Sequence, residues 1–384
     1  MIYLDNAATS WPKPDTVYEA VVAFMREKGA NPGRSGYDMA VAAEKVINDT
    51  RAALARLFNA PDAKDIVFTL NCTDSLNLAL KGLLRRGHHV ISDSIGHNSL
   101  VRPLKRLEQQ GVAVTRIPPG DADGAVSPLD VEAAITPATR LIAITHASNV
   151  GGVIQPVAAI GEIARKHNVF LLVDAAQSAG ALEIDVQAAN IDLLAFSGHK
   201  GLLGPMGTGG LYVGQRVDLE QVREGGTGTF SESEEQPLER PNRYESGTPN
   251  APGIAGLGAG LQYLMERTIA DVREHESMLL AHLLDGMAAI PGLTVYGPHD
   301  RSKRISIAPF TVEGWSPGEV ATVLDSAFEI KVRAGLHCAP AAHKVLGTFP
   351  KGCVRVGIGC FNTSQDIDDF LHALKEIAHS EPLG

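Results

Sequence analysis

The chain has 384 residues, 44% of them apolar and 20% charged, so it can form a buried core and lacks the composition of a disordered protein. Its 34 Lys and Arg and 44 Asp and Glu give a net charge of −10, which argues against a general binder of nucleic acid or anionic membranes. Four Cys cannot form a disulfide framework in a chain of this length. The first residues do not have the order of a signal peptide, and no apolar run is long enough to span a bilayer. We expect a soluble, cytoplasmic protein with no nucleic-acid partner and no membrane partner.

The first two thirds of the chain alternate apolar strand-like runs with amphipathic segments. We expect strands at residues 65–70, 88–93, 112–117, 140–145, 169–174, 193–197 and 210–213. Apolar residues recur at helical spacing in residues 74–86, 100–110 and 157–167. This alternation predicts an α/β fold in which helices cover both faces of a mostly parallel sheet. In such sheets ligands bind at the carboxyl ends of the strands.

The pattern changes after residue 225. Residues 225–252 are rich in Gly, Thr, Ser, Glu and Pro, which predicts a long functional loop. We then expect a long helix at 254–289, strands at 293–296, 305–310 and 354–358, and helices near 317–327 and 365–379. The predicted division is a large domain of residues 15–252 and a small α+β domain of residues 253–384. Residues 1–14 are expected to pack near the small domain.

Lys200 follows an expected strand and precedes a glycine-rich stretch at residues 201–210. A lysine in a crevice at a strand end can lose its charge through desolvation and become a nucleophilic amine. Ser197 and His199, beside it, could hold a phosphate. A solvated loop lysine is the alternative, and local evidence alone favours that alternative.

Asp174 ends another apolar strand, where an unpaired carboxylate would be costly to bury. A protonated pyridine nitrogen would supply a partner, as in enzymes that use pyridoxal phosphate. Gln177, three residues further on, could then reach the ring hydroxyl of that cofactor. Capping of the following helix by Asp174 is an equally good interpretation.

Polar residues mark two further strand ends. Thr73 begins an expected helix, whose N-terminus offers N–H groups to a phosphate, although helix capping explains this residue as well. His97 follows the strand at 88–93 and could stack on an aromatic cofactor or move protons. A lone loop histidine usually does neither.

Cys338 lies in an expected loop with His337 beside it and Arg333 nearby. Cationic neighbours lower the pKa of a thiol and favour the reactive thiolate. Arg355 lies within an apolar strand and needs a carboxylate, which is either that of a substrate or that of a structural salt bridge.

A metal site is a rival interpretation of the same region. Its ligands would be His337, Cys338, His343, Cys353 and Cys360. No pair among them has the Cys-x2-Cys spacing typical of zinc sites, so we expect no metal.

In this order the motifs resemble the class V aminotransferase-like family of pyridoxal phosphate enzymes, and within it the cysteine desulfurases and selenocysteine lyases. The similarity runs nearly end to end. It is carried by Tyr-Leu-Asp-Asn-Ala-Ala-Thr at 3–9, Asn-Pro-Gly-Arg at 31–34, Ser-Gly-His-Lys at 197–200, Glu-Ser-Gly-Thr-Pro-Asn at 245–250 and Arg-Ala-Gly-Leu-His-Cys at 333–338. The resemblance implies fold type I, with a seven-stranded, mostly parallel sheet in the large domain.

The resemblance also implies roles for single residues. Lys200 would bind pyridoxal 5'-phosphate covalently and later move protons, and His97 would stack on the ring. Asp174 would pair with the pyridine nitrogen and Gln177 with the ring hydroxyl. The phosphate would be bound by Thr73, Ser197, His199 and the backbone of Cys72. Asn149 would lie near the substrate and the ring. Thr248 would reach the phosphate of the other subunit, which implies a homodimer.

For the reaction, the resemblance implies that Cys338 accepts sulfur from L-cysteine while Arg355 holds the substrate carboxylate. L-Alanine would leave, and the persulfide on Cys338 would pass to a sulfur-acceptor protein. The segment between these two residues is short beside family members that carry the cysteine on a long mobile loop, which limits how far Cys338 can swing.

Three alternatives stay open. A selenocysteine lyase, acting on L-selenocysteine, would share the whole scaffold. An aminotransferase, C–S lyase or epimerase is disfavoured by the motif at 333–338. A non-catalytic protein that binds the cofactor is disfavoured by the complete set of Lys200, Asp174 and His97.

Overall fold

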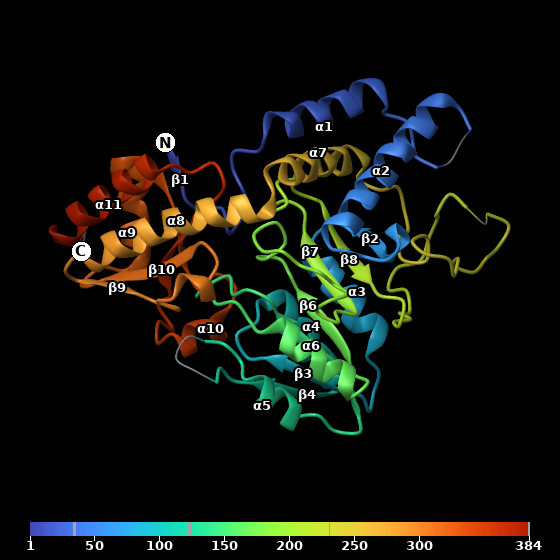
Figure 1. Ribbon diagram of the computed structural model, residues 1–384, viewed down its shortest axis with the longest axis horizontal. Coiled ribbons are helices and arrows are strands. Elements are labelled where there is room, and N and C mark those ends of the chain that lie inside the picture. The colour runs from blue at the N-terminus through green and yellow to red at the C-terminus, as the bar shows by residue number, and fades with distance from the viewer. Residues whose placement is uncertain (34–35, 121–123, 230, 383–384) are drawn as a thin grey trace.

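The computed structural model describes residues 1–33, 36–120, 124–229 and 231–382. Arg34 of the expected Asn-Pro-Gly-Arg motif lies outside these residues. The chain forms a larger region around one sheet and a smaller region around another, joined by the helices α7 (Ala251–Arg267) and α8 (Ile269–Ala288) (Figure 1).

The sheet of the larger region has seven strands in the order β2-β8-β7-β6-β5-β3-β4. The strands from β7 to β4 run parallel, and β8 is antiparallel to both of its neighbours. The predicted α/β fold with a mostly parallel sheet is confirmed. The bounds are β2 (Ile66–Thr69), β3 (His89–Asp93), β4 (Ala113–Ile117), β5 (Thr139–Thr145), β6 (Phe170–Asp174), β7 (Leu193–Ser197) and β8 (Gly209–Val213).

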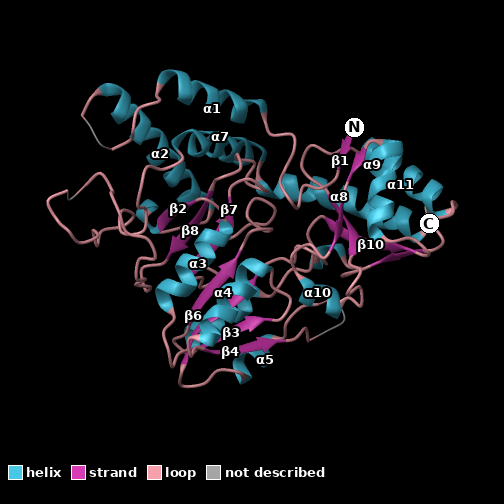
Figure 2. Cartoon of the chain, turned by 180° about the vertical axis from the view of Figure 1, so that it is seen from behind, coloured by secondary structure: helices cyan, strands magenta, loops and turns pink. Residues whose placement is uncertain are grey.

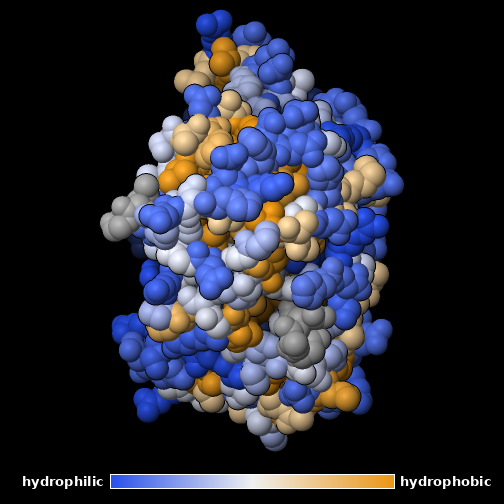
Figure 3. Space-filling view, turned by 90° about the vertical axis from the view of Figure 1, so that its left-hand side faces the viewer, coloured by the Kyte–Doolittle hydropathy of each residue, from blue (hydrophilic) through white to orange (hydrophobic). Residues whose placement is uncertain are grey.

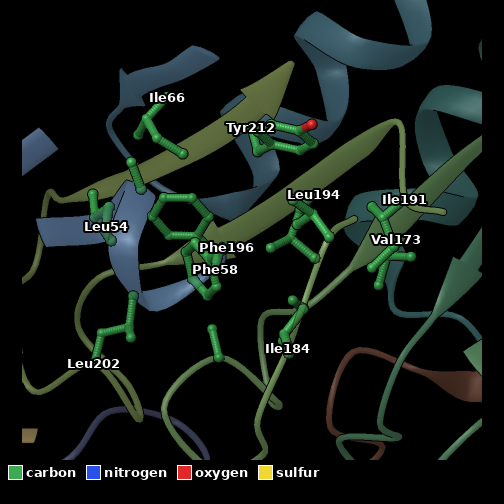
Figure 4. Close-up of a cluster of buried hydrophobic side chains, with 14 of the residues drawn as sticks. Leu54, Phe58, Ile66, Val173, Ile184, Ile191, Leu194, Phe196, Leu202 and Tyr212 are labelled. Atoms are coloured by element: carbon green, nitrogen blue, oxygen red, sulfur yellow. The ribbon is translucent and has the colours of Figure 1, made fainter. Parts of the chain in front are cut away.

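Helices cover both faces of this sheet, as the strand alternation requires. Along β6, Leu171 and Val173 point into one apolar cluster and Phe170 and Leu172 into the other. In the first cluster the rings of Phe58 and Phe196 lie 5.1 Å apart (Figure 4). The helices of the larger region are α1 (Asp15–Glu27), α2 (Asp38–Leu57), α3 (Cys72–Leu83), α4 (Asn98–Gln109), α5 (Pro128–Ala133) and α6 (Val157–Lys166), with a short 3-10 turn η1 (Ala63–Asp65).

The smaller region is built on an antiparallel sheet with the order β12-β13-β10-β9. In Figure 2, β10 of this sheet lies beside α8. Its core contains Leu280, Phe310, Leu324 and Phe370. The two-residue strand β1 (Ile2–Tyr3) pairs with β11 (Ile330–Lys331), so the start of the chain lies against this region. The other bounds are β9 (Leu293–Val295), β10 (Ile307–Val312), β12 (Arg333–Gly335), β13 (Cys353–Gly357), α9 (Pro317–Phe328), α10 (Pro340–Val345), α11 (Ser364–Ala378) and the 3-10 turn η2 (Arg301–Lys303).

The prediction of one long helix over residues 254–289 is wrong. Thr268 has a φ of +67°, which ends α7, and its hydroxyl accepts a hydrogen bond from the backbone N–H of Asp271 at 3.1 Å. A threonine N-cap of this kind starts a new helix. The loop predicted at 225–252 is a loop in the described residues up to Asn250.

Hydrophilic residues cover most of the end of the molecule formed by the smaller region, and apolar residues come to the surface between them (Figure 3). Among the described residues, no helix combines the length and the apolar character that crossing a membrane requires.

Candidate active site

A cavity of about 350 Å³ lies at the carboxyl ends of the central strands, between the two regions. Such a volume is in the range of small-molecule sites. The predicted residues that line it are Cys72, Thr73, His97, Asn149, Asp174, Gln177, Ser197, His199, Lys200 and Arg355. The fold therefore brings together residues that are far apart in the sequence.

Lys200 is half-buried in this cavity, and burial lowers the pKa of its ammonium group. The positive charges of Arg355 and Arg333 act in the same direction, and the charge of Asp174 opposes them. The backbone packs tightly behind the lysine, because a Cβ atom at Gly201 would lie 2.5 Å from the carbonyl oxygen of Ala179. A lysine with a lowered pKa is a better nucleophile and base at neutral pH.

Asp174 is the last residue of β6 and is 3% exposed. Its Oδ1 accepts a hydrogen bond from the backbone N–H of Ala176 at 3.0 Å and another from the thiol of Cys72 at 3.3 Å. Burial and the charge of Asp174 raise the pKa of Cys72 well above its usual value, so this thiol stays protonated and can donate. The carboxylate also lines the cavity, where it can accept a hydrogen bond from a ligand.

One end of the cavity is suited to a phosphate. The N-terminus of α3 opens there, with Thr73 in its first turn and Asn71 as its N-cap. Free N–H groups at a helix N-terminus bind anions. Ser197 and His199 line the same cavity, and burial lowers the pKa of His199 to about 4, so its imidazole is neutral.

His97 caps α4 and is held in a defined tautomer. Its Nδ1 accepts a hydrogen bond from the backbone N–H of Ser99 at 3.1 Å, so the proton of the neutral ring is on Nε2. Burial lowers the pKa of His97, which keeps the ring neutral. A neutral, anchored imidazole is suited to stacking on a flat ligand.

Arg355 is 1% exposed and already has two partners. Its Nη2 lies 2.7 Å from Oδ1 of Asp5, and its Nη1 donates to the carbonyl oxygen of Asn149 at 2.9 Å. Its buried Nε has no hydrogen-bond partner among the described residues. The structural salt bridge is therefore present, and Arg355 also lines the cavity. Sequence reasoning missed Asp5, although its motif was noted.

Gln177 and Thr248 have positions that the sequence could not define. The side-chain amide of Gln177 donates to the carbonyl oxygen of Ala7 at 2.9 Å, which fixes it at the cavity wall. Thr248 is exposed and lines a separate hollow beside Glu245 and Pro249. It is not among the residues that line the cavity of Lys200.

Cys338 lies in a turn between β12 and α10, and its thiol is exposed. His337 and Cys338 both have positive φ values, +48° and +57°. The carbonyl oxygen of His337 accepts a hydrogen bond from the side chain of Asn149 at 2.7 Å, and that of Cys338 accepts one from the N–H of Asn98 at 2.9 Å. Nη2 of Arg333, which lines the cavity of Lys200, lies 3.7 Å from Sγ of Cys338.

A chain of hydrogen bonds between two buried histidines supports this turn. The carbonyl oxygen of Arg333 can only accept, so Nε2 of His337 donates to it at 3.1 Å. Nδ1 of His337 must then accept from Nε2 of His343 at 3.2 Å, and Nδ1 of His343 accepts from the hydroxyl of Thr348 at 2.7 Å. Burial lowers the pKa of His337 to about 3, which keeps the chain neutral.

The same histidines belong to a group that bears on the rival metal site. Ligand atoms of His337, His343 and Cys353 all lie within 4.8 Å of one another. Cys338 and Cys360, the other residues considered, are not in this group. Each nitrogen of the two rings already has a hydrogen-bond partner, so the contacts are those of a neutral imidazole pair.

The comparisons with known proteins agree with this geometry. The family model for aminotransferase class V matches residues 2–370. The chain belongs to the class V aminotransferase family. A protein named probable cysteine desulfurase from Methanothermobacter thermautotrophicus is 37% identical over 98% of this chain and 94% of its own length. Another protein of that name, from Halalkalibacterium halodurans, is 35% identical over 98% of this chain and 93% of its own length.

Solved structures of family members show the same fold. The apo structure of a cysteine desulfurase from Thermococcus onnurineus NA1 superposes with a TM-score of 0.91, at 34% identity, over 98% of this chain and 94% of that one. The cysteine desulfurase CsdA from Escherichia coli superposes with a TM-score of 0.87, at 30% identity, over 97% of this chain and 94% of that one. The expected fold type I architecture is confirmed.

Pyridoxal phosphate is the cofactor that the family implies, and the residues of this chain fit it. A half-buried lysine with a lowered pKa faces a buried aspartate across one cavity. An anchored neutral histidine and a helix N-terminus line the same space. The lysine matches the aldehyde of the cofactor, and the aspartate matches its ring nitrogen. The histidine matches the ring face, and the helix N-terminus matches the phosphate.

Proposed function

We propose that this protein is a pyridoxal phosphate-dependent cysteine desulfurase that converts L-cysteine to L-alanine and keeps the sulfur on Cys338. The observation that carries the proposal is the position of this thiol. It is exposed beside the cofactor cavity, and Arg333 contacts its sulfur while lining that cavity. The names of the relatives that match the whole chain support the same activity.

The first half of the reaction needs a base and an electron sink. When bound, pyridoxal phosphate withdraws electrons from the α-carbon of the amino acid, which makes loss of the α-proton possible. Nζ of Lys200, with its lowered pKa, takes and returns that proton. The carboxylate of Asp174 keeps the ring nitrogen protonated, and His97 covers the ring face.

The second half of the reaction belongs to Cys338. Its thiolate attacks the sulfur of the substrate, an S–S bond forms, and the bond from that sulfur to the β-carbon breaks. The electron pair goes to the substrate carbon skeleton, which is protonated and leaves as L-alanine. Arg355, through its guanidinium, and Asn149 orient the substrate carboxylate in the cavity.

We also propose that the enzyme is a homodimer in which Thr248 completes the phosphate site of the other subunit. Its exposure and its distance from the cavity of its own chain support this arrangement. A sulfur-acceptor protein then removes the sulfur from Cys338. The four free cysteines, which include this exposed thiol, suit a reducing compartment such as the cytoplasm.

The test is to incubate the purified yellow protein with L-cysteine and to measure L-alanine and the mass of a persulfide on Cys338. Cys338→Ser should abolish both products and retain exchange of the substrate α-proton with D2O. Cys360→Ala, which removes a buried thiol, is the matched control and should retain both products. Pyruvate as the product, or transamination that depends on a keto acid, would contradict the proposal. The same assay with L-selenocysteine separates desulfurase from selenocysteine lyase activity.

A further inference from the structure

A second hollow opens directly beside Cys338, outside the cofactor cavity. It has a volume of about 380 Å³ and runs between α3 and α4. Thr73 and His97 separate it from the cavity, because both residues line both spaces. We call this hollow the Cys338 groove. Its position leaves the thiol of Cys338 accessible from a side that the cofactor and the substrate do not use.

The Cys338 groove has a charge opposite to that of the whole chain. Lys81 from α3 and Arg102 and Arg106 from α4 line it, and all three side chains are exposed. Arg102 and Arg106 are four residues apart, so they lie on one face of α4. Within the described ranges of the chain, no carboxylate forms a salt bridge with any of these three cations. The chain as a whole has a net charge of −10.

Two neighbouring cations outside the groove differ from those inside it. Lys105, also on α4, pairs with Glu108 at 2.7 Å and does not line the groove. Arg116 pairs with the same carboxylate at 3.5 Å. Thus Lys105 and Arg116, outside the groove, are paired with an acid of the chain itself, whereas the cations inside it are available to an external anion.

The backbone of Cys338 is hydrogen-bonded beside this groove. Its carbonyl oxygen accepts a hydrogen bond from the N–H of Asn98, the first residue of the helix that carries Arg102 and Arg106. The left-handed turn around it is held from behind by the chain of buried histidines. The groove is the open space through which an acceptor of sulfur can reach the thiol in this position.

We propose that the Cys338 groove docks an acidic segment of a protein that carries the thiol accepting sulfur from Cys338. The inference rests on the proposed desulfurase function and specifies its partner. The acceptor thiolate attacks the outer sulfur of the Cys338 persulfide, and the bond between the two sulfurs of that persulfide breaks. The electron pair stays on Sγ of Cys338, so the thiolate is regenerated and no oxidant or reductant is consumed. Opposite charges raise the rate of such an encounter, and salt lowers it.

The test uses three synthetic peptides of equal length, each with one cysteine flanked by Glu, Gln or Lys. The holoenzyme is first loaded with sulfur from L-cysteine, and transfer to each peptide is then timed per loaded site. We expect transfer to the Glu peptide to exceed transfer to the Gln peptide by about tenfold at low salt, and to lose this advantage near 1 M salt. The Lys peptide should be the slowest.

The variant R102Q/R106Q should lower the ratio of Glu-peptide to Gln-peptide transfer by about tenfold, towards one. K105Q removes a cation from the same helix outside the groove, and it should keep the ratio of the unaltered protein. Taking the ratio within each variant cancels the different pKa values of the peptide thiols.

Failure of the inference is distinct from failure of the function. If no persulfide forms on Cys338, the proposed function is wrong and no transfer can be timed. If the persulfide forms but all three peptides accept sulfur at rates that do not change in R102Q/R106Q, the groove proposal is overturned. A change of oligomeric state in R102Q/R106Q, measured by sedimentation, with no change in peptide preference would assign the groove to a second copy of the chain and overturn it as well.

Discussion

The floor of the cofactor cavity, by which we mean Asp174, Ser197 and Lys200, differs in its surroundings from the turn that carries Cys338. Asp174 and Ser197 end strands in which every residue is buried, and Lys200 follows directly. Cys338 is exposed on a turn between the short edge strand β12 and the six-residue helix α10. The contrast suggests a division of labour, in which a rigid floor holds the groups for proton chemistry and an accessible turn passes a group outward.

The turn is nevertheless not a loose loop. His337 and Cys338 both have positive φ values, a conformation that is unfavourable for residues other than glycine. Two such residues in a row need support from their surroundings. Asn149, Asn98 and the buried histidines supply that support. The cavity and the turn therefore share a wall, and four variants can separate their contributions.

The largest effect is expected at the floor. K200A should lower L-alanine formation by about 10³-fold, because the variant has neither the covalent attachment of the cofactor nor the base for the α-proton. Stopped-flow detection of α-proton exchange measures the loss directly. K105A is the matched control, since Lys105 pairs with Glu108 on α4 and lies outside the cavity lining. An equal loss in both variants would contradict the role of Lys200.

A smaller but still large effect is expected from D174N, which keeps the shape of the side chain and removes its charge. The neutral amide does not stabilise a protonated ring nitrogen. The rate of α-proton exchange should therefore fall by about 10²-fold, and the absorption band of the cofactor should shift. D93N is the control, because Asp93 is equally buried at the end of β3, which β5 separates from β6, and does not line the cavity. Normal exchange in D174N would show that another group protonates the ring.

At the turn that carries Cys338, we expect a loss of about tenfold in the rate of persulfide formation and no loss in the earlier steps. H343F removes the donor to His337 and should slow persulfide formation while leaving α-proton exchange unchanged, because only the presentation of Cys338 is altered. It should also lower the free energy of unfolding by about 1–3 kcal/mol through lost buried hydrogen bonds. H343Q keeps a donor near the position of Nε2 and should restore most of the persulfide rate. Equal slowing of both steps would mean that the histidine chain supports the whole cavity.

The smallest effect concerns pH. The pKa of His337 is lowered to about 3 in the folded chain, below the value of about 6.5 expected when unfolded. The unfolded chain then binds more protons, so the stability from this residue is present above pH 6.5 and is lost as the pH falls towards 3. Between pH 7.5 and 5.5 the loss should be about 1 kcal/mol, and urea unfolding of H337Q should lack that part of the dependence. An identical pH dependence in H337Q would show that His337 is not buried as a neutral ring.

Much of the floor could be predicted from the sequence. Apolar runs predicted all seven strands of the main sheet, and polar residues directly after them predicted the lining of the cavity. Both signals are local, because a buried strand needs only a few consecutive apolar residues. The turn at Cys338 was also expected as a loop from its local motif.

The errors and omissions concern features that depend on contacts between distant residues or on a single backbone angle. The break at Thr268 has no interruption of the apolar pattern around it. The division between residues 252 and 253 stays a prediction, although α7 begins close to it. The helices α1 and α2 were not expected, and both pack against α7 across a long stretch of sequence.

The sequence by itself determined which residue types stand at the strand ends, and hence the lysine, the aspartate and the exposed cysteine of a class V aminotransferase. Only the tertiary structure decided which distant residues contact one another. Asp5 meets Arg355 across 350 residues, His337 bonds to His343, and three cations from two helices gather beside Cys338. No local spacing encodes such pairs, because they exist only when the separately folded sheets and helices are packed together.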